Sequence, residues 1–247
     1  MDQTFLSLMD TLGKSNQIST FSKTTFRQQI KFEDDPDLAK MLEMSAGEVK
    51  KFEIFVTPLF DGFIGDAAFT PDLNQRKNII SQLLNGLQQL TDANKCHNDI
   101  KPSNVLYRKR NNSYSIRIAD FGQCGGKGGT PGWTAPVFHR ERKPGKEDMF
   151  SVGWICLRLL CASKDLFLSL RDNYVEIDNA SWMTGFRSMI EIEFVQKLVD
   201  LNSLATVQQV KEHWDRIRSS VQMIDLPRLQ DIGVPGNSLR TQIERPR

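Results

Sequence analysis

The sequence predicts an α+β fold, in which a small strand-containing N-terminal part precedes a larger, mainly helical part. Strand-like alternation dominates the first third of the chain, whereas apolar residues at helical spacing dominate after Gly62. A loop-rich stretch containing many glycines and prolines, roughly residues 95–147, interrupts the helical part. Because binding and catalytic residues often lie on loops, we expect the functional signal in that stretch.

The first third contains two predicted strands. Residues 25–32 alternate between apolar and polar side chains, and residues 51–59 (KFEIFVTPL) have the strongest strand character, ending at Asp61-Gly62. Between these runs, Asp35-Pro36-Asp37 has the composition of a helix start and is followed by a short apolar stripe.

Four helices are predicted after Gly62. Residues 74–90 carry a clean apolar face, and residues 149–160 (MFSVGWICLRLL) are apolar nearly all round, as in a helix buried at the centre of a domain. Residues 186–201 and 205–217 are amphipathic. A short strand is predicted at 115–119, and from residue 225 the polar, proline-containing tail is expected to be extended.

Composition excludes several classes of protein. Apolar residues make up 39% and charged residues 25%, as in soluble globular proteins, and the net charge of +2 does not require nucleic acid as a partner. No apolar run approaches the roughly 20 residues that span a bilayer, and the start lacks the basic segment of a signal peptide. The four cysteines form no CxxC pair, so we expect a cytoplasmic protein, with the nucleus as an alternative.

Four motifs occur in and after the loop-rich stretch. They are HNDIKPSNVL at 97–106, DFG at 120–122, GTPGWTAP at 129–136 and DMFSVG at 148–153. In this order they resemble the H-R-D-x-K-x-x-N catalytic loop, the D-F-G triplet, the G-T-x-x-Y/W-x-A-P-E segment and the D-x-x-S-x-G helix start of eukaryotic-type protein kinases. The chain is therefore identified as similar to that superfamily, in its serine/threonine branch.

The resemblance implies a protein-kinase-like fold with three parts. Residues 1–60 would form a reduced kinase-like N-lobe, residues 61–224 the C-lobe, and residues 225–247 a C-terminal tail. The implied ligands are ATP and Mg²⁺ or Mn²⁺, and the implied partner is a protein substrate or a regulated protein.

The resemblance also assigns roles to individual residues. Asp99 would accept or orient the proton of the substrate hydroxyl, and Lys101 would reach the γ-phosphate. Asn104 and Asp120 would hold the metal ions that bridge the phosphate oxygens. Thr130 resembles the threonine that contacts the catalytic loop in serine/threonine kinases. This resemblance favours serine or threonine over tyrosine as the substrate residue.

Three other positions would be structural. His97 and Phe121 resemble packing residues of a stack that links the lobes, and Asp148 resembles a buried carboxylate that accepts backbone N–H groups of the catalytic loop.

Two further positions depart from the pattern as an apolar pair. Val137 replaces the glutamate of A-P-E and Leu204 aligns with its arginine partner, so we expect these two residues to lie near each other.

Asn98 departs from the pattern because it replaces the arginine that senses activation-loop phosphate. The loop sequence QCGGKG after Gly122 contains no hydroxyl. Together these changes predict a protein that activation-loop phosphorylation does not switch.

The N-terminal part departs furthest from the family. Gly13 is the only glycine kept from the Gly-rich loop, Lys31 in QQIK is a candidate for the ATP-binding lysine, and Glu43 or Glu48 could pair with it. Two functions remain open: a protein kinase that transfers the γ-phosphate of ATP to Ser/Thr hydroxyls, and a pseudokinase or truncated kinase-like module that binds and regulates another protein without catalysis.

Overall fold

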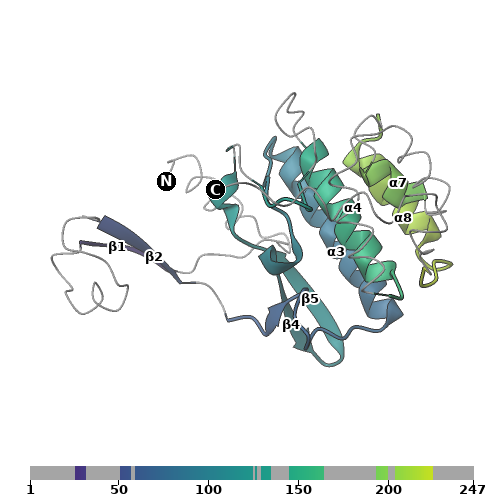
Figure 1. Cartoon of the computed structure of the whole chain (residues 1–247), viewed down its shortest axis with the longest axis horizontal. Helices are drawn as coiled ribbons and strands as arrows, with labels where there is room; N and C mark the ends of the chain where they lie inside the picture. The colour runs from purple at the N-terminus through teal and green to yellow at the C-terminus, as the bar shows by residue number, and fades with distance from the viewer. Residues whose placement is uncertain are drawn as a thin grey trace, which may run out of the picture.

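The computed structural model describes residues 26–31, 51–56, 59–124, 126, 129–134, 145–163, 193–199 and 204–224, with backbone alone for the first two ranges (Figure 1). The fold is α+β, as the sequence predicts. Among the described residues, no helix is long and apolar enough to cross a membrane.

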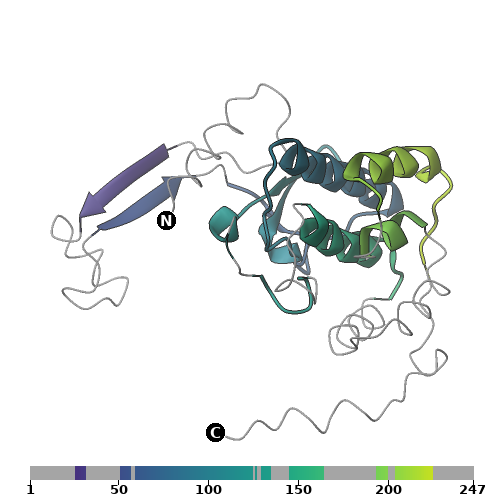
Figure 2. The ribbon, with the colours of Figure 1, turned by 90° about the horizontal axis from the view of Figure 1, so that it is seen from above.

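The N-terminal part contains an antiparallel pair of strands. β1 (Phe26–Lys31) pairs with β2 (Lys51–Val56) and places Phe26 opposite Val56 and Lys31 opposite Lys51. Both strands lie inside the predicted ranges. Figures 1 and 2 show this pair set apart from the helices.

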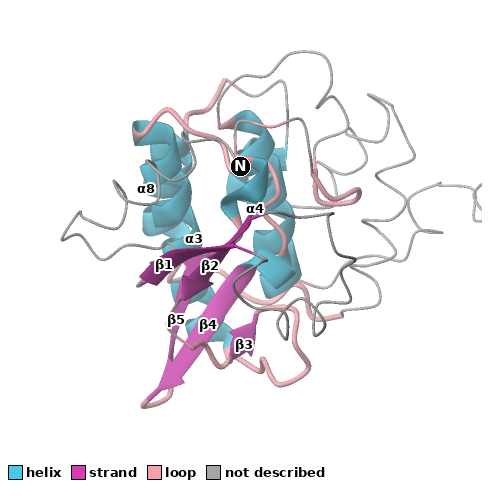
Figure 3. Ribbon diagram, turned by 90° about the vertical axis from the view of Figure 1, so that its left-hand side faces the viewer, coloured by secondary structure: helices cyan, strands magenta, loops and turns pink. Residues whose placement is uncertain are grey.

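A second sheet has the strand order β3-β4-β5 (Figure 3). It consists of β3 (Gly62–Phe63), β4 (Val105–Arg110) and β5 (Ser113–Ile118), all antiparallel. Asn111 and Asn112 form the β4–β5 turn with φ angles of 46° and 60°, a left-handed conformation that asparagine tolerates better than most residues. β5 begins two residues before the predicted 115–119 strand, and β3 and β4 were not predicted as strands.

The long helix α3 (Leu73–Asp92) packs against this sheet and against the other helices. It begins at a capping box, in which the Asp72 carboxylate accepts the N–H of Gln75 and the Gln75 side chain accepts the N–H of Asp72. Its six predicted apolar positions are all buried: Ile79, Ile80, Leu83, Leu84, Leu87 and Leu90. Gln82 joins the helix to β5, since its side chain bonds both Tyr114 O and Ile116 N at 2.9 Å.

The central helix α4 (Lys146–Leu160) is buried on nearly every side, as its apolar composition predicts. It lies between α3 and α7 (Glu193–Val199), and α8 (Val207–Ile217) packs on α3, where Trp214 Nε1 donates to Ser81 Oγ at 2.8 Å. The helices form one side of this core and the β4–β5 hairpin the other (Figure 1). The loop between α3 and β4 therefore emerges where the two sides meet.

Candidate active site

The β4–β5 hairpin brings two predicted metal ligands to the same end of the sheet. β4 begins directly after Asn104, and β5 ends two residues before Asp120. Antiparallel pairing of Val105 with Ile118 therefore aligns these ends, and Ala119 N donates to Asn104 O at 2.8 Å. Asp120 is left-handed (φ 63°, ψ 69°), a region that aspartate visits more readily than most residues.

Asp99, in the loop between α3 and β4, is the centre of a side-chain network. Its Oδ1 accepts a hydrogen bond from Thr130 Oγ1 at 2.6 Å, and its Oδ2 accepts from Lys101 Nζ at 2.8 Å. Lys101 Nζ also donates to Thr130 Oγ1 at 2.8 Å, which closes a triangle. Residues predicted to share the transfer chemistry are thus within hydrogen-bond distance of one another, although Thr130 comes from a different loop.

The network keeps the Asp99 carboxylate ionised. Burial would by itself raise the pKa of Asp99, but the hydrogen bonds from Lys101 and Thr130 and the charge of Lys101 outweigh burial and lower it below its ordinary value. At neutral pH the carboxylate is therefore an acceptor, which is the form that a proton acceptor needs.

Asn104 is oriented so that its oxygen is left for a ligand. Its Nδ2 donates to the backbone O of Asp99 at 2.9 Å and to Asp99 Oδ2 at 3.2 Å. No hydrogen bond within the described residues engages its Oδ1. Within the described residues, the Asp120 carboxylate accepts one long hydrogen bond, from Gly122 N at 3.4 Å. An amide oxygen and an exposed carboxylate are hard donors of the kind that Mg²⁺ prefers, so the chemistry of both donors suits a magnesium ion.

Asp148, at the start of α4, accepts hydrogen bonds from the backbone of the loop that contains Asp99. Its Oδ2 accepts the backbone N–H of His97 at 2.7 Å and its Oδ1 accepts that of Asn98 at 2.9 Å. The side chain is fully buried. The predicted role of Asp148 is therefore confirmed, and it ties the loop to the best-packed helix of the fold.

His97 is a packing residue in its neutral form. Its ring lies 4.7 Å from that of Phe121. Nε2 bonds Ala119 O at 2.9 Å, so Nε2 carries the proton, and Nδ1 then accepts Asp99 N–H at 3.3 Å. Burial lowers the pKa of His97, and this effect outweighs the charge of Asp148, which acts to raise it. A second ring proton would also remove the acceptor at Nδ1.

Acidification is expected to destabilise the fold through His97. Below its ordinary pKa of 6.5, the unfolded chain takes up a proton that folded His97 excludes, so the free energy of unfolding falls with pH. We expect the Tm to fall between pH 7 and pH 5.5, and to fall less in His97→Phe, although that variant starts from a lower Tm. Equal falls in both proteins, measured by differential scanning fluorimetry, would contradict this role.

Asn98 holds the segment that follows the D-F-G triplet. It is left-handed (φ 68°), and its Nδ2 donates to the backbone O of Gln123 at 3.0 Å. Gly129 (φ 150°) lies where a Cβ would meet the Thr134 side chain and the Asn98 carbonyl, so the chain requires glycine there. The segment is therefore hydrogen-bonded to the loop containing Asp99 at Gln123, and at Gly129 it passes too close to that loop for a larger residue.

Ser151 anchors residues 129–134 to α4. Its Oγ donates to Trp133 O at 2.7 Å. The D-x-x-S-x-G motif contains this serine, but the pattern alone assigned it no role. The spacing of three residues from Asp148 was the available signal, since it places both side chains on one helix face.

The structure does not describe the side chains of most of the remaining predicted residues. Lys31 ends β1 and only its backbone is described, while Gly13, Glu43 and Val137 lie outside the described residues. Leu204 is 94% exposed. Its expected nearness to Val137 stays a prediction, because Val137 lies outside the described residues.

Comparison with known proteins gives a family match over most of the chain. A family profile described as "Protein kinase domain" matches residues 55–224. This range contains the whole Asp99 network and begins inside β2.

Individual relatives have low identity. Calcium/calmodulin-dependent protein kinase type 1 of Caenorhabditis elegans is 29% identical over 141 residues, covering 50% of this chain and 40% of the relative. Serine/threonine-protein kinase ATG1c of Arabidopsis thaliana is 30% identical over 171 residues (62% and 22%). Myosin light chain kinase A of Dictyostelium discoideum is 24% identical over 276 residues (94% and 92%). The match thus spans under half the length of the first two relatives.

Proposed function

Because this chain belongs to the protein kinase family, we propose that it transfers the γ-phosphate of ATP to serine or threonine hydroxyls of a protein. The observation that carries the proposal is the triangle of Asp99, Lys101 and Thr130. These are the groups that must accept a proton and offset phosphate charge, and they are already in contact with one another.

Each side chain then has a task in the transfer. Asp99, ionised at neutral pH, orients the attacking hydroxyl and accepts its proton. Lys101 offsets the charge on the transferred phosphoryl group, as a fixed cation does without reorganising. Thr130 is hydrogen-bonded to both Asp99 and Lys101, and it would lie beside the substrate residue that receives the phosphate.

Asn104 and Asp120 would hold the metal ion. A Mg²⁺ ion held there would supply positive charge that offsets the negative charge of the phosphate groups. Asn104 would contribute Oδ1, because its Nδ2 donates both of its hydrogen bonds to Asp99. Asp120 would contribute its exposed carboxylate, held at the end of the hairpin by its left-handed backbone.

Independence from activation-loop phosphorylation is supported by Asn98. A phosphate-sensing arginine would need a phosphorylated residue to hold the segment, whereas Asn98 already bonds its backbone at Gln123. The stretch from Gly122 to Gly129 also contains no hydroxyl. Asn98 would therefore hold the backbone at Gln123 without any modification of the chain.

Loss of the Asn98 bond is expected to slow transfer. Asn98→Gly keeps the left-handed backbone but removes the amide, and we expect kcat to fall about 2- to 10-fold, the equivalent of one hydrogen bond. Asn98→Ala should lose more, since alanine is also strained at φ 68°. Phosphatase treatment of the wild type should leave kcat unchanged. A fall after phosphatase, or full activity in both variants, would contradict the proposal.

For the N-terminal part, we propose residues 1–60 as a reduced N-lobe with Lys31 on the nucleotide, residues 61–224 as the C-lobe and 225–247 as a tail. An intracellular location in a reducing compartment agrees with the four cysteines, all of which are free thiols.

A direct transfer assay tests the proposed function. The purified chain is incubated with γ-labelled ATP, a Ser/Thr peptide library and Mg²⁺ or Mn²⁺, beside Asp99→Ala and Asp120→Ala. Transfer that disappears in both variants supports the kinase. A thermal shift on nucleotide without transfer would instead support the pseudokinase, a binding module that regulates another protein.

A further inference from the structure

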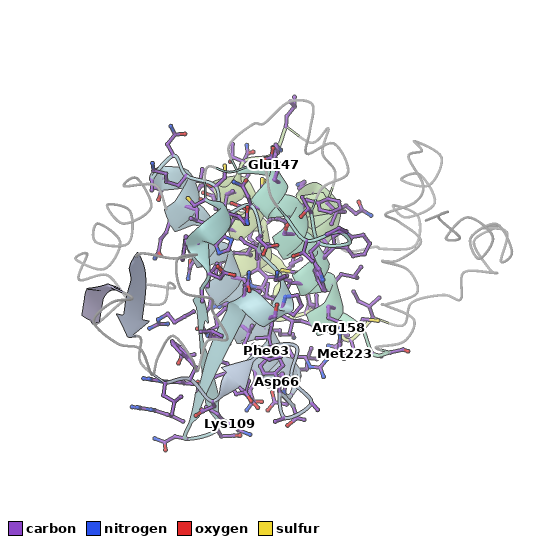
Figure 4. All side chains as sticks on the ribbon, turned by 60° about the vertical axis from the view of Figure 1, so that its left-hand side comes forward. Phe63, Asp66, Lys109, Glu147, Arg158 and Met223 are labelled. Carbon is purple, nitrogen blue, oxygen red and sulfur yellow. The ribbon has the colours of Figure 1, made fainter. Side chains whose placement is uncertain are left out.

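The β4–β5 hairpin concentrates positive charge. Residues 105–118, which form its two strands and their turn, contain four basic side chains and no acidic one, whereas the whole chain has a net charge of only +2. The four basic residues are Arg108, Lys109, Arg110 and Arg117. Figure 4 shows Lys109 at one edge of the molecule and Glu147, at the start of α4, near the opposite edge. The hairpin therefore presents its charge at the periphery of the fold.

Strand alternation places three of the four basic residues on one face of the hairpin. Successive side chains of a strand point to opposite faces, and the buried positions of β4 and β5 lie on the face that packs against α3. Arg108 and Arg110 of β4 and Arg117 of β5 alternate with those buried positions, so they lie on the outer face. Arg108 pairs with Ser115, two positions before Arg117. We call these three arginines the basic face.

Two residues of the basic face are held in place and still have donors to spare. Arg108 donates from Nε and from one terminal nitrogen to Leu59 O, and its guanidinium lies 5.1 Å from the centre of the Phe60 ring. One terminal nitrogen of Arg117 donates to Ile116 O at 2.7 Å. Because a guanidinium has five N–H groups, these bonds within the described residues use two donors of Arg108 and one of Arg117. Burial and the charge of Arg108 lower the pKa of Arg117, although a guanidinium stays charged.

The basic face is not neutralised by the part of the chain that the structure describes. None of its three arginines forms an ion pair with a carboxylate there. Asp61, which precedes β3, uses its carboxylate to accept the backbone N–H of Lys109 at 2.7 Å. The outer face also carries Ser113 and Ser115, which are both exposed. A row of cations with hydroxyl groups between them is complementary in charge to an acidic, extended segment of another protein.

Strand geometry gives the distance of the basic face from the candidate active site. β4 begins directly after Asn104, and Arg108 and Arg110 follow that residue by four and six positions. An antiparallel strand rises about 3.4 Å per residue, so these positions lie about 14 and 20 Å along the strand from Asn104. An extended chain covers at most about 3.6 Å per residue. A carboxylate bound at Arg108 would therefore be at least about four residues from a hydroxyl at Asp99.

Resting on the proposed kinase function, we propose that the basic face binds an acidic segment of the protein substrate, at least about four residues away from the phosphorylated serine or threonine. Carboxylates of this segment would accept charge-assisted hydrogen bonds from Arg108 and Arg117, and the exposed Arg110 would add attraction. Binding of the segment would raise the effective concentration of the accepting hydroxyl at Asp99. The segment is therefore expected to lower KM and to leave kcat unchanged.

The test uses peptides that share one accepting serine and carry, on either side of it, a Gly-Ala linker of about ten residues followed by about six Glu or six Gln residues. We expect the wild type to have a KM about 10-fold lower for the Glu peptide on at least one side, as hydrogen bonds to charged groups allow. Arg110→Gln/Arg117→Gln should reduce this ratio to about 2-fold or less. The matched control Arg216→Gln/Arg218→Gln removes two exposed charges from α8 and should keep the full ratio. No preference in the wild type, or equal ratios in the two double variants, would overturn the proposal.

Two further measurements separate the possible failures. If Arg110→Gln/Arg117→Gln does not fold, Arg110→Gln alone changes only an exposed side chain and should lose part of the ratio, whereas an unchanged ratio counts against the basic face. If the wild type transfers phosphate to no peptide, the kinase function fails, and fluorescence anisotropy of the labelled Glu and Gln peptides then tests the face alone. Tighter binding of the Glu peptide to the wild type and to the α8 control than to Arg110→Gln/Arg117→Gln supports the basic face. Equal binding to all three proteins refutes it.

Discussion

Replacing Asp99 by asparagine is expected to lower kcat about 10³-fold, within the range that a positioned acid or base contributes. The amide cannot accept the hydroxyl proton. Its NH₂ group would also face donors, because Lys101 Nζ and Asn104 Nδ2 both point at Oδ2. Lys101 would then lose its ion pair and move from its place beside Thr130. Single-turnover transfer, measured with saturating ATP, gives the rate directly.

Thr130→Val is the matched comparison for this experiment. It removes the hydroxyl but leaves the pair of Asp99 and Lys101 in contact, so we expect a loss of only about 2- to 10-fold, the equivalent of one hydrogen bond. If Thr130→Val were as slow as Asp99→Asn, the network would act by shape alone, and Asp99 would not be the proton acceptor.

The second large effect concerns stability. Asp148→Ala is expected to lower the free energy of unfolding by about 2–6 kcal/mol, because two buried N–H groups, those of His97 and Asn98, lose their acceptor at about 1–3 kcal/mol each. A domain of this kind is stable by only about 5–15 kcal/mol, so the variant should be close to unfolding. Urea titration followed by tryptophan fluorescence measures the change.

Two further variants keep this prediction testable. Asp148→Asn retains one oxygen, so it should lose about half as much stability and remain folded. Asp215→Ala removes an exposed carboxylate from α8 and should change stability by less than about 0.5 kcal/mol. Urea midpoints that coincide for Asp148→Ala and Asp215→Ala would show that the loop does not depend on Asp148.

Much of the site could be predicted because its residues lie in short motifs. Asp99, Lys101 and Asn104 share one motif, and the resemblance of that motif to the kinase catalytic loop implied a common task. Helix α3 was predicted almost to its ends, since a 3.6-residue apolar period is a local property. The β4 strand was not predicted, even though Asn111-Asn112 is a turn signal. The basic residues 108–110 at the end of this strand interrupt the alternation of apolar and polar side chains that predicts a strand.

What the sequence alone determined is therefore the fold class, the positions of the main helices and the set of candidate catalytic and metal-binding residues. Tertiary structure decided the rest: that Asn98 bonds Gln123, that Leu204 is exposed, and that Arg76 and Arg158 line one hollow with Pro102. The reason is physical. Periodicity and motif spacing act within a few residues, whereas these contacts, and the exposure of Leu204, depend on how segments far apart in the chain pack around a shared core.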